Sequence, residues 1–399
     1  MSKATETFER FLSTNSIFKK KEVLQANYTP ENIPHREEQI EQIAKILAPA
    51  LKLNKPSNLF IYGKTGTGKT LSVIHTTNKI KELAEQRATP VKIIYVNCKL
   101  KKVADTEYRL IAQFIREFGK EIATTGLPTD EVYKYFFKLV DQKKQIIILV
   151  LDEIDQLVKK TGDEIMYNLT RINSELKESQ IAIVGISNDL VFTDNLDPRV
   201  KSTLSEEEII FKPYDALQIQ DILTQRAKEA FKENALSQGV IAKCAAYAAR
   251  EHGDARRALE LLRIAGEVAE REGAEKVEIR HLDEAEEKLE KERVVDIVSS
   301  QPKQFQAILY SVLLLSAKNS KIFETGELYN TYRKICMSVN LRPLTQRRVS
   351  DIISELDMLG IINARIISKG RYGRTREISL AINKSAEQKI MEIVEKEFH

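Results

Sequence analysis

The fold is decided by the stretch Asn58-Leu59-Phe60-Ile61-Tyr62-Gly63-Lys64-Thr65-Gly66-Thr67-Gly68-Lys69-Thr70. Its first five residues predict a short apolar strand, and the residues after Thr70 predict a helix. A strand, a glycine-rich loop and a helix in this order are typical of a P-loop. The glycines let backbone N–H groups face phosphate oxygens without a Cβ in the way, and Lys69 adds a positive charge for the β- and γ-phosphates. The stretch therefore predicts a site for a nucleoside triphosphate.

A second motif supports this interpretation. The run from Gln145 to Leu151 predicts a buried parallel strand, and Asp152 and Glu153 follow at its C-terminal end. We expect the Thr70 hydroxyl and the Asp152 carboxylate to hold Mg²⁺, and Glu153 to orient or deprotonate the attacking water. The alternative for the acids is a cap on the next helix, which the preceding P-loop disfavours.

Another predicted strand, residues 180–187, is followed by Asn188. A polar amide at a strand end beside these acids can reach the γ-phosphate or the attacking water, although Ser187-Asn188-Asp189 alone would be interpreted as a turn. Near the N-terminus, two prolines bend the segment 27–36 before a predicted amphipathic helix. This bent segment, including Ile33, His35 and Arg36, is expected to lie against a purine ring, and the alternative is a plain loop.

Composition limits the class of protein. The chain has 399 residues, 42% of them hydrophobic and 30% charged, which is typical of a globular protein of two or three domains. No apolar run approaches the roughly 20 residues that span a bilayer, and Met1 to Arg10 lacks a signal-peptide core. Three widely spaced cysteines fit neither a disulfide framework nor a zinc site. We therefore expect reduced thiols, no membrane partner and no export.

Positive charge is concentrated at the C-terminal end. Residues 300–399 hold 16 basic and 10 acidic side chains, whereas the rest of the chain holds 46 and 48. The net charge is thus +6 in the last hundred residues and −2 elsewhere. This asymmetry indicates a nucleic acid or another acidic surface as the partner of the C-terminal region. The basic run Lys19 to Lys21 is interpreted as a solvated N-terminal arm, and the alternative is an arm that contacts phosphates.

The second half of the chain is mainly helical. From about Phe211 to Val298 the apolar periodicity predicts four amphipathic helices. Residues 304–317, 324–337 and 346–359 predict three more, with Thr345 as the expected N-cap of the last. Two strands, 361–368 and 374–382, flank the tip Lys369-Gly370-Arg371-Tyr372-Gly373-Arg374. Three helices followed by a hairpin with a basic tip predict a winged helix.

A winged helix places its third helix in the major groove and its wing against a neighbouring groove. The residues expected to contact DNA are Thr345, Gln346, Arg347 and Arg348 at the helix and Arg365, Lys369, Arg371, Tyr372 and Arg374 in the hairpin. Winged helices also contact proteins, but the window 342–376 holds eight basic and three acidic residues, which favours nucleic acid.

Taken together, the motifs resemble those of the archaeal replication initiators of the origin-recognition-complex and cell-division-cycle-six family, which are AAA+ proteins. The resemblance covers nearly the whole chain. It is carried by the P-loop, by residues 151–155 with Asp152 and Glu153, and by these further stretches: Ile33-Pro34-His35-Arg36-Glu37-Glu38-Gln39, Gly185-Ile186-Ser187-Asn188-Asp189, Leu196-Asp197-Pro198-Arg199-Val200-Lys201-Ser202, Phe211-Lys212-Pro213-Tyr214 and Gly253-Asp254-Ala255-Arg256-Arg257-Ala258-Leu259.

The resemblance implies roles for single residues. Asn188 is similar to sensor one, Arg256 to the sensor-two arginine, and Tyr214 and Arg226 to positions that line the nucleotide. The whole predicted nucleotide site is Gly63, Lys64, Thr65, Gly66, Thr67, Gly68, Lys69, Thr70, Leu71, Tyr214, Arg226, Arg256, Ile33, His35 and Arg36. Residues 105–140 resemble the initiator-specific insertion that touches DNA in this family. Lys120, Thr124 and Thr125 are its expected contacts.

One departure from the wider AAA+ pattern concerns hydrolysis. Many relatives carry an arginine finger where this chain has Thr203, and Arg199 or Lys201 is a poor substitute. We therefore expect a weak ATPase that works as a slow switch. The expected fold class is an α/β P-loop AAA+ core over residues 1–209, an all-helical lid over 210–298 and a C-terminal winged helix over 299–399.

The function implied by the resemblance is an ATP-dependent DNA replication initiator that binds and deforms duplex origin DNA and helps to load the replicative helicase. ATP or ADP with Mg²⁺ is the expected cofactor. The expected partners are origin DNA, an MCM-type helicase and initiator paralogues, in the cytoplasm and nucleoid of an archaeal cell. Two alternatives remain, namely a nucleotide-gated transcription regulator and a clamp-loader-like subunit.

Overall fold

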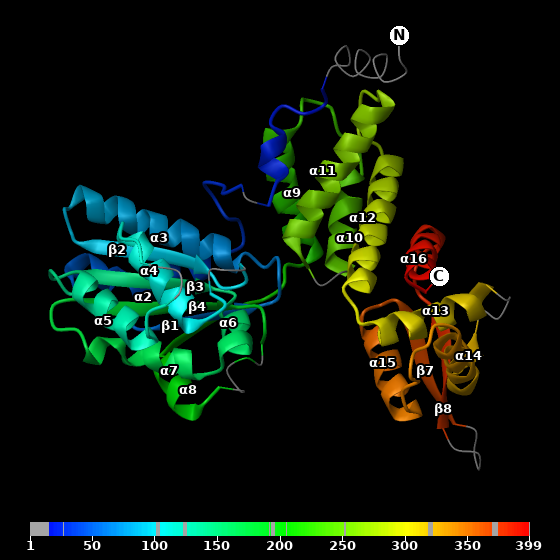
Figure 1. Cartoon of the computed structure of the whole chain (residues 1–399). Helices are drawn as coiled ribbons and strands as arrows, with labels where there is room; N and C mark the ends of the chain where they lie inside the picture. The colour runs from blue at the N-terminus through cyan, green and yellow to red at the C-terminus, as the bar shows by residue number, and fades with distance from the viewer. Residues whose placement is uncertain are drawn as a thin grey trace, which may run out of the picture. The chain divides into compact units, whose positions relative to one another are not determined.

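The computed structural model describes residues 16–26, 28–100, 104–122, 126–190, 192, 196–204, 206–250, 253–317, 322–368 and 374–398. The chain divides into two compact units, residues 1–279 and 280–399 (Figure 1).

The first unit is built on a five-stranded parallel sheet in the order β2-β3-β4-β1-β5. The strands are β1 (Leu59–Gly63), β2 (Val91–Asn97), β3 (Ile146–Asp152), β4 (Gln180–Ser187) and β5 (Glu207–Phe211). Every residue of β3 is buried, because alternate side chains enter different cores on the two faces of the sheet. The apolar run predicted as a buried strand is therefore confirmed.

Helices cover both faces of this sheet. On one face lie α2 (Glu37–Leu47) and α3 (Lys69–Gln86), whose apolar side chains share a core with Ile146, Ile148 and Val150. On the other face, a core around Ile147 and Leu149 is completed by α4 (Glu107–Glu117), α5 (Thr129–Val140), α6 (Ile154–Thr161), α7 (Glu164–Arg171) and α8 (Pro198–Leu204). The short turns η2 (Ala48–Lys52) and η3 (Ile172–Ser174) follow α2 and α7. The parallel order brings the C-terminal ends of β1, β3 and β4 to one edge.

The remaining helices of the first unit are α9 (Ala216–Ala230), α10 (Val240–Arg250) and α11 (Ala255–Glu272). Asp215 begins α9 with a capping box, and Asp254 begins α11 by accepting two backbone N–H groups. These helices match three of the four that the periodicity predicts. The fourth, α12 (Ile279–Ser299), contributes Val294 and Val298 to the core of the second unit.

The solvated N-terminal arm is a wrong prediction for the part that the structure describes. Ile17 and Phe18 are buried, and η1 (Lys21–Leu24) packs against α9 and α11. Phe18 pairs with Phe231 at a centroid distance of 4.7 Å, and a Cβ added at Gly266 would lie 2.4 Å from the Phe18 ring. The burial of two apolar side chains beside the lysine run stabilises this packing, while Lys19 and Lys20 remain exposed.

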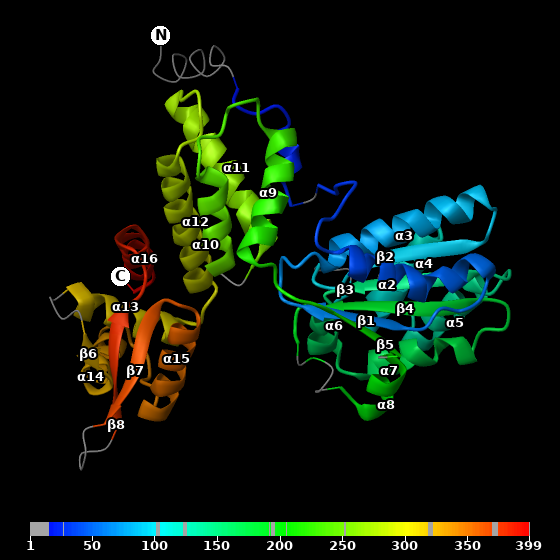
Figure 2. The same cartoon turned by 180° about the vertical axis from the view of Figure 1, so that it is seen from behind.

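The second unit joins helices to a three-stranded antiparallel sheet in the order β6-β8-β7. Its elements after α12 are α13 (Lys303–Ala317), β6 (Phe323–Glu324), α14 (Thr325–Ser338), α15 (Gln346–Met358), β7 (Ile362–Ser368), β8 (Arg374–Leu380) and α16 (Lys384–Phe398). The hairpin of β7 and β8 lies beside α15 in both views (Figure 2). The predicted three helices and hairpin are confirmed, and α16 is an addition that packs on α13.

Candidate functional site: a nucleotide pocket and a DNA-binding face

The P-loop has the backbone geometry that its glycines permit. Gly66 and Gly68 have φ angles of 69° and 89°, in the left-handed region that favours glycine. A Cβ at Gly68 would lie only 2.8 Å from the Tyr214 hydroxyl oxygen. The loop ends at the N-terminus of α3, an 18-residue helix whose first N–H groups favour an anion.

Lys69 is the centre of the site. Its ammonium group donates to the carbonyl oxygens of Gly63 at 2.8 Å and Lys64 at 2.7 Å, and to Oδ1 of Asn188 at 2.9 Å. Burial lowers the pKa of Lys69 to about 8, with Asp152 opposing this change and Arg256 adding to it. The structure therefore brings together the P-loop lysine and the amide predicted at the end of β4.

The two predicted metal ligands, Thr70 and Asp152, lie in direct contact. Oδ2 of Asp152 accepts from the Thr70 hydroxyl at 3.0 Å and from the Tyr95 hydroxyl at 2.7 Å, while Oδ1 accepts from the Glu153 N–H at 2.9 Å. Burial and the Asp152 charge raise the pKa of Tyr95. Sequence reasoning missed Tyr95, because its approach to Asp152 follows from the β2–β3 register, in which Tyr95 lies two residues before the partner of Asp152.

Glu153 lies at the rim of the same site. Its backbone is left-handed, with a φ of 54°, which is uncommon for a residue other than glycine and typical of sites that place a side chain for function. The carboxylate lies 3.7 Å from the ammonium nitrogen of Lys99. Because Lys99 is mostly exposed, this ion pair is a weak restraint.

The start of α11 lies directly on the P-loop. The Ala255 N–H donates to the Gly66 carbonyl at 3.3 Å, and a Cβ at Gly66 would lie 1.8 Å from Oδ1 of Asp254. This contact places the next residue, Arg256, where its charge lowers the pKa of Lys69. The helical lid is thereby in direct contact with the loop expected to hold phosphate.

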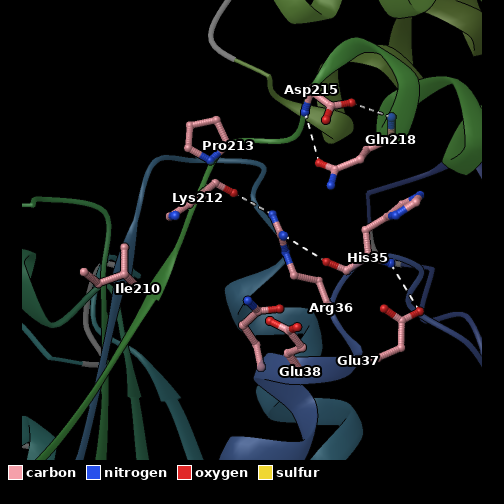
Figure 3. A pocket seen from close by; sticks show the side chains of 10 residues that line it. His35, Arg36, Glu37, Glu38, Ile210, Lys212, Pro213, Asp215 and Gln218 are labelled. Atoms are coloured by element: carbon pink, nitrogen blue, oxygen red, sulfur yellow. Dashed lines mark hydrogen bonds between the residues drawn. The ribbon is translucent and has the colours of Figure 1, made fainter.

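Arg36 connects the P-loop to the segment that leads into α9. Its Nε donates to the Thr67 carbonyl at 2.8 Å and its NH2 donates to the Lys212 carbonyl at 2.6 Å. The guanidinium stacks 3.8 Å from the ring centroid of Tyr214, and burial lowers its pKa. Arg36 also lines a hollow of about 530 Å³. Figure 3 shows its guanidinium there, bonded to the carbonyls of Lys212 and His35. Its contacts in this structure are those of a brace for the P-loop.

The other predicted nucleotide residues lie around this centre. Ile33 is buried, Leu71 is half-buried, and His35 pairs with Asp221 at 3.2 Å. Arg226 stacks 4.7 Å from the ring centroid of Tyr28, and its NH1 is buried without a partner among the described residues. A second hollow, of about 410 Å³, adjoins the P-loop and is lined by Lys64, Asp155, Lys159, Asn188, Asp189 and Leu190.

In the second unit, the predicted DNA-binding residues begin α15. The Thr345 hydroxyl accepts the Arg348 N–H at 3.4 Å, so Thr345 is the N-cap. Gln346, Arg347 and Arg348 are exposed, and Arg348 lies 3.6 Å from Asp351. Arg365 is exposed on β7. An exposed polar start on a helix whose other face is buried has the form of a recognition helix.

Several predicted contacts fall outside what the structure describes. They are Thr124, Thr125, Lys369, Arg371 and Tyr372, and also the side chain of Arg374. The side chain of Thr203, at the expected finger position, is likewise outside the description. Lys120 is exposed just after α4. Arg199, considered above as a substitute finger, is bound to Asp197 through Nε at 3.1 Å and NH2 at 3.0 Å.

The described residues lack the features of two other site types. No group of three or more His, Cys, Asp and Glu side chains is arranged to hold a metal ion. Across the same residues, no helix combines the length and apolar character that crossing a membrane requires. The three cysteines are buried thiols.

Comparison with known proteins agrees with this architecture. Residues 53–190 match the family model of the AAA domain, 220–287 that of the Cdc6 AAA+ ATPase-type lid domain, and 296–389 that of the CDC6 C-terminal winged helix domain. The chain is 54% identical to the ORC1-type DNA replication protein of Pyrococcus abyssi over 94% of this chain and 90% of the relative. It is 50% identical to the ORC1-type DNA replication protein 1 of Methanosarcina acetivorans, over 96% and 92%.

A solved structure is similar over the whole length. The Aeropyrum pernix ORC1 protein in complex with DNA superposes with a TM-score of 0.80 at 43% identity, covering 95% of this chain and 97% of that one. The predicted combination of an AAA+ core, a helical lid and a C-terminal winged helix is confirmed. The chain belongs to the family of ORC1-type DNA replication initiators.

Proposed function

We propose that this protein is an ATP-dependent initiator that binds and deforms duplex origin DNA and helps to recruit and load an MCM-type replicative helicase. The observation that carries the proposal is the convergence of Lys69, Asn188, Thr70 and Asp152 at the P-loop, in a chain that also exposes two arginines, Arg347 and Arg348, at the start of α15. The similar ORC1 structure contains DNA, which supports the second half of the proposal.

The residues fit ATP and Mg²⁺. The left-handed glycines and the start of α3 form a cradle for phosphates, and the Thr70 and Asp152 oxygens, 3.0 Å apart, are of the kind that Mg²⁺ prefers. Thr70 and Asp152 would hold the ion, which neutralises phosphate charge when bound. Lys69 neutralises the β- and γ-phosphates, and Asn188 orients the γ-phosphate or the attacking water.

Hydrolysis in this proposal is slow. Glu153 accepts the proton of the attacking water. Arg256, at the start of α11, responds to whether ATP or ADP is bound. The position of the family's arginine finger is occupied by Thr203, so hydrolysis completed by a neighbouring subunit is not part of the proposal. The change from ATP to ADP then controls helicase recruitment on DNA. The protein acts in the cytoplasm and nucleoid of the cell, together with initiator paralogues. The proposed domain boundaries are residues 209 and 298.

The direct test is footprinting of the purified full chain on chromosomal origin fragments and on promoter fragments. Protection of origin fragments, with changes in cleavage that report bent DNA, is expected. Protection confined to promoters would instead identify a transcription regulator. A helicase-recruitment assay on the protected fragments then tests the loading step separately.

The pH dependence of ATP affinity tests the role of Lys69. Above pH 8 its amine is neutral in the free protein, and bound phosphates favour the ammonium form, so binding then takes up a proton. We expect ATP affinity to be nearly flat from pH 7 to 8 and to fall about tenfold for each further pH unit. Calorimetric titrations in two buffers of different ionisation enthalpy measure both the affinity and the proton uptake.

Two comparisons control this measurement. A Lys79→Ala variant, which changes an exposed lysine of the same helix, should keep the wild-type profile. In the absence of nucleotide, the unfolded chain binds the additional proton between pH 8 and 10.5, so Lys69 contributes a rise in the free energy of unfolding of up to about 1.4 kcal/mol per pH unit. Above pH 9 the raised pKa of the buried Cys98 thiol opposes this rise. A wild-type affinity that stays flat up to pH 9.5 contradicts the role of the Lys69 charge.

Arg347→Ala tests the DNA-binding face. Removing this exposed guanidinium from the start of α15 should weaken duplex binding by about 1–3 kcal/mol if it reads a base, or lower the salt slope by about 1 if it binds a phosphate. Fluorescence anisotropy at several salt concentrations distinguishes the two. Wild-type affinity together with a wild-type slope would make the winged helix a protein-contact module.

A further inference from the structure

Arg376, at the base of the wing, makes contacts that the motif analysis did not predict. It lies on β8, and its NH1 donates to the Ser350 carbonyl at 3.2 Å and to the Ser354 hydroxyl at 2.7 Å, both on α15. Ser354 in turn donates to the Ser350 carbonyl at 3.0 Å. The guanidinium is therefore fixed between the wing and the recognition helix.

The helix face that receives Arg376 is the one expected to meet DNA. Gln346, Ser350 and Ser354 follow one another at intervals of four residues, so they lie on one face of α15. Gln346 and Ser354 are exposed, and Ser350 is half-buried. Arg376 thus holds the same face that carries a predicted base-contacting residue.

On the strand side too, the Arg376 contact lies next to solvent. In the β7–β8 ladder Arg376 pairs with Ile366, and directly opposite residues point to the same face of a sheet. On the same face, the next pair away from the wing tip is Ala364 and Ile378, which pack in the core of the second unit. Ile366, in contrast, is 66% exposed. Arg376 therefore lies where this face passes from the core to solvent.

The guanidinium retains donors for a ligand. Arginine has five N–H donors in a planar fork. Among the described residues, the side-chain hydrogen bonds of Arg376 come only from NH1, and the Nε and NH2 groups carry three further donors. Arg376 is half-buried, so its fork is partly shielded and partly accessible. A planar pair of donors of this kind matches two oxygens of a phosphate.

We propose that Arg376 binds a backbone phosphate of duplex DNA where the recognition helix meets the wing, and that Ser350 and Ser354 position it. The inference rests on the proposed DNA binding and adds a residue to it. Because two hydrogen bonds already fix the side chain, little conformational freedom remains to be lost on binding. The contact also sets the register of the wing relative to α15 on the duplex.

The experiment measures duplex affinity of the full chain by fluorescence anisotropy at several salt concentrations. Arg376→Ala should weaken binding about five- to one-hundred-fold and reduce the salt slope by about 1. Arg376→Lys should keep the slope but lose several-fold in affinity, roughly half the effect of alanine, because an ammonium group cannot form the fork. Ser354→Ala should lose a few-fold, about as a single neutral hydrogen bond would, with the slope unchanged.

Controls separate this contact from general effects. Lys389→Ala removes one positive charge from α16, at a side chain paired with Glu392, and should bind as the wild type does. Thermal unfolding of each variant reports whether the fold is kept. The inference is overturned if Arg376→Ala binds with wild-type affinity and slope, or if it loses affinity with an unchanged slope and a lower melting temperature, since the residue is then only a brace.

Two further outcomes are decisive. A loss confined to origin duplexes and absent on random duplexes would identify a base edge, and would overturn the phosphate assignment. If the wild-type chain itself fails to bind any duplex, the proposed function fails, and this inference fails with it. Wild-type binding with unaffected variants, in contrast, rejects the role of Arg376 alone.

Discussion

Lys69→Ala is expected to abolish measurable ATP binding. The variant removes the charge that meets the β- and γ-phosphates, at a side chain that is 5% exposed and bonded to Gly63, Lys64 and Asn188. Loss of one partner from a buried charged pair costs about 3–5 kcal/mol, which is roughly a hundred- to several-thousand-fold in affinity. Titration with a fluorescent ATP analogue measures the loss.

The matched control for this variant is Lys79→Ala. Lys79 lies on the same helix, is exposed and pairs with Glu82, so its removal should change ATP affinity less than twofold. Both variants should have wild-type circular dichroism, because the Lys69 ammonium has a burial cost that alanine does not carry. Normal nucleotide affinity in Lys69→Ala would refute the P-loop assignment.

Glu153→Gln is expected to separate binding from hydrolysis. The amide cannot accept the proton of the attacking water, so the rate of a single turnover should fall about a hundred- to ten-thousand-fold. ATP affinity should stay close to that of the wild type, because Glu153 lies beside the Thr70–Asp152 pair and contacts the site through its own N–H bond to Asp152. Rapid-quench measurement of phosphate release gives the rate.

A second carboxylate provides the comparison for this variant. Glu178→Gln neutralises an exposed acid before β4 whose backbone N–H, unaffected by the change, is bonded to Asp141. Its hydrolysis rate should equal that of the wild type. If Glu153→Gln hydrolyses ATP at the wild-type rate, the base is another group, and the left-handed backbone at Glu153 serves only the turn into α6.

Much of the fold was predictable because it follows from local patterns. The run before Asp152 is apolar at every position, as a strand buried on both faces must be, and it forms β3. The four-residue spacing of apolar side chains likewise predicted α9 to α12 and α15. Other elements carried weaker patterns. The strand β5 has two exposed acids at its start, and α16 follows a hairpin that already completed the expected winged helix.

The N-terminal segment shows why one prediction was wrong. Charge in Lys19 to Lys21 indicated a solvated arm, but Ile17 and Phe18 precede it and find a partner surface on α9 and α11. The Lys19 N–H donates to the Ala230 carbonyl at 2.7 Å, more than two hundred residues away in the chain. A local pattern of charge carries no information about such a distant partner.

The sequence by itself determined the chemistry of the nucleotide site and the class of each domain. The spacing of the glycines determines the backbone conformation of the P-loop. A carboxylate that ends an apolar strand lies at the C-terminal edge of a parallel sheet, whichever strand is its neighbour. Only the tertiary structure decided how Tyr95 meets Asp152, how Asp254 lies on Gly66, and how Arg376 is held by Ser350. The physical reason is that sheet register and helix packing create these contacts between distant segments, and no short pattern encodes them.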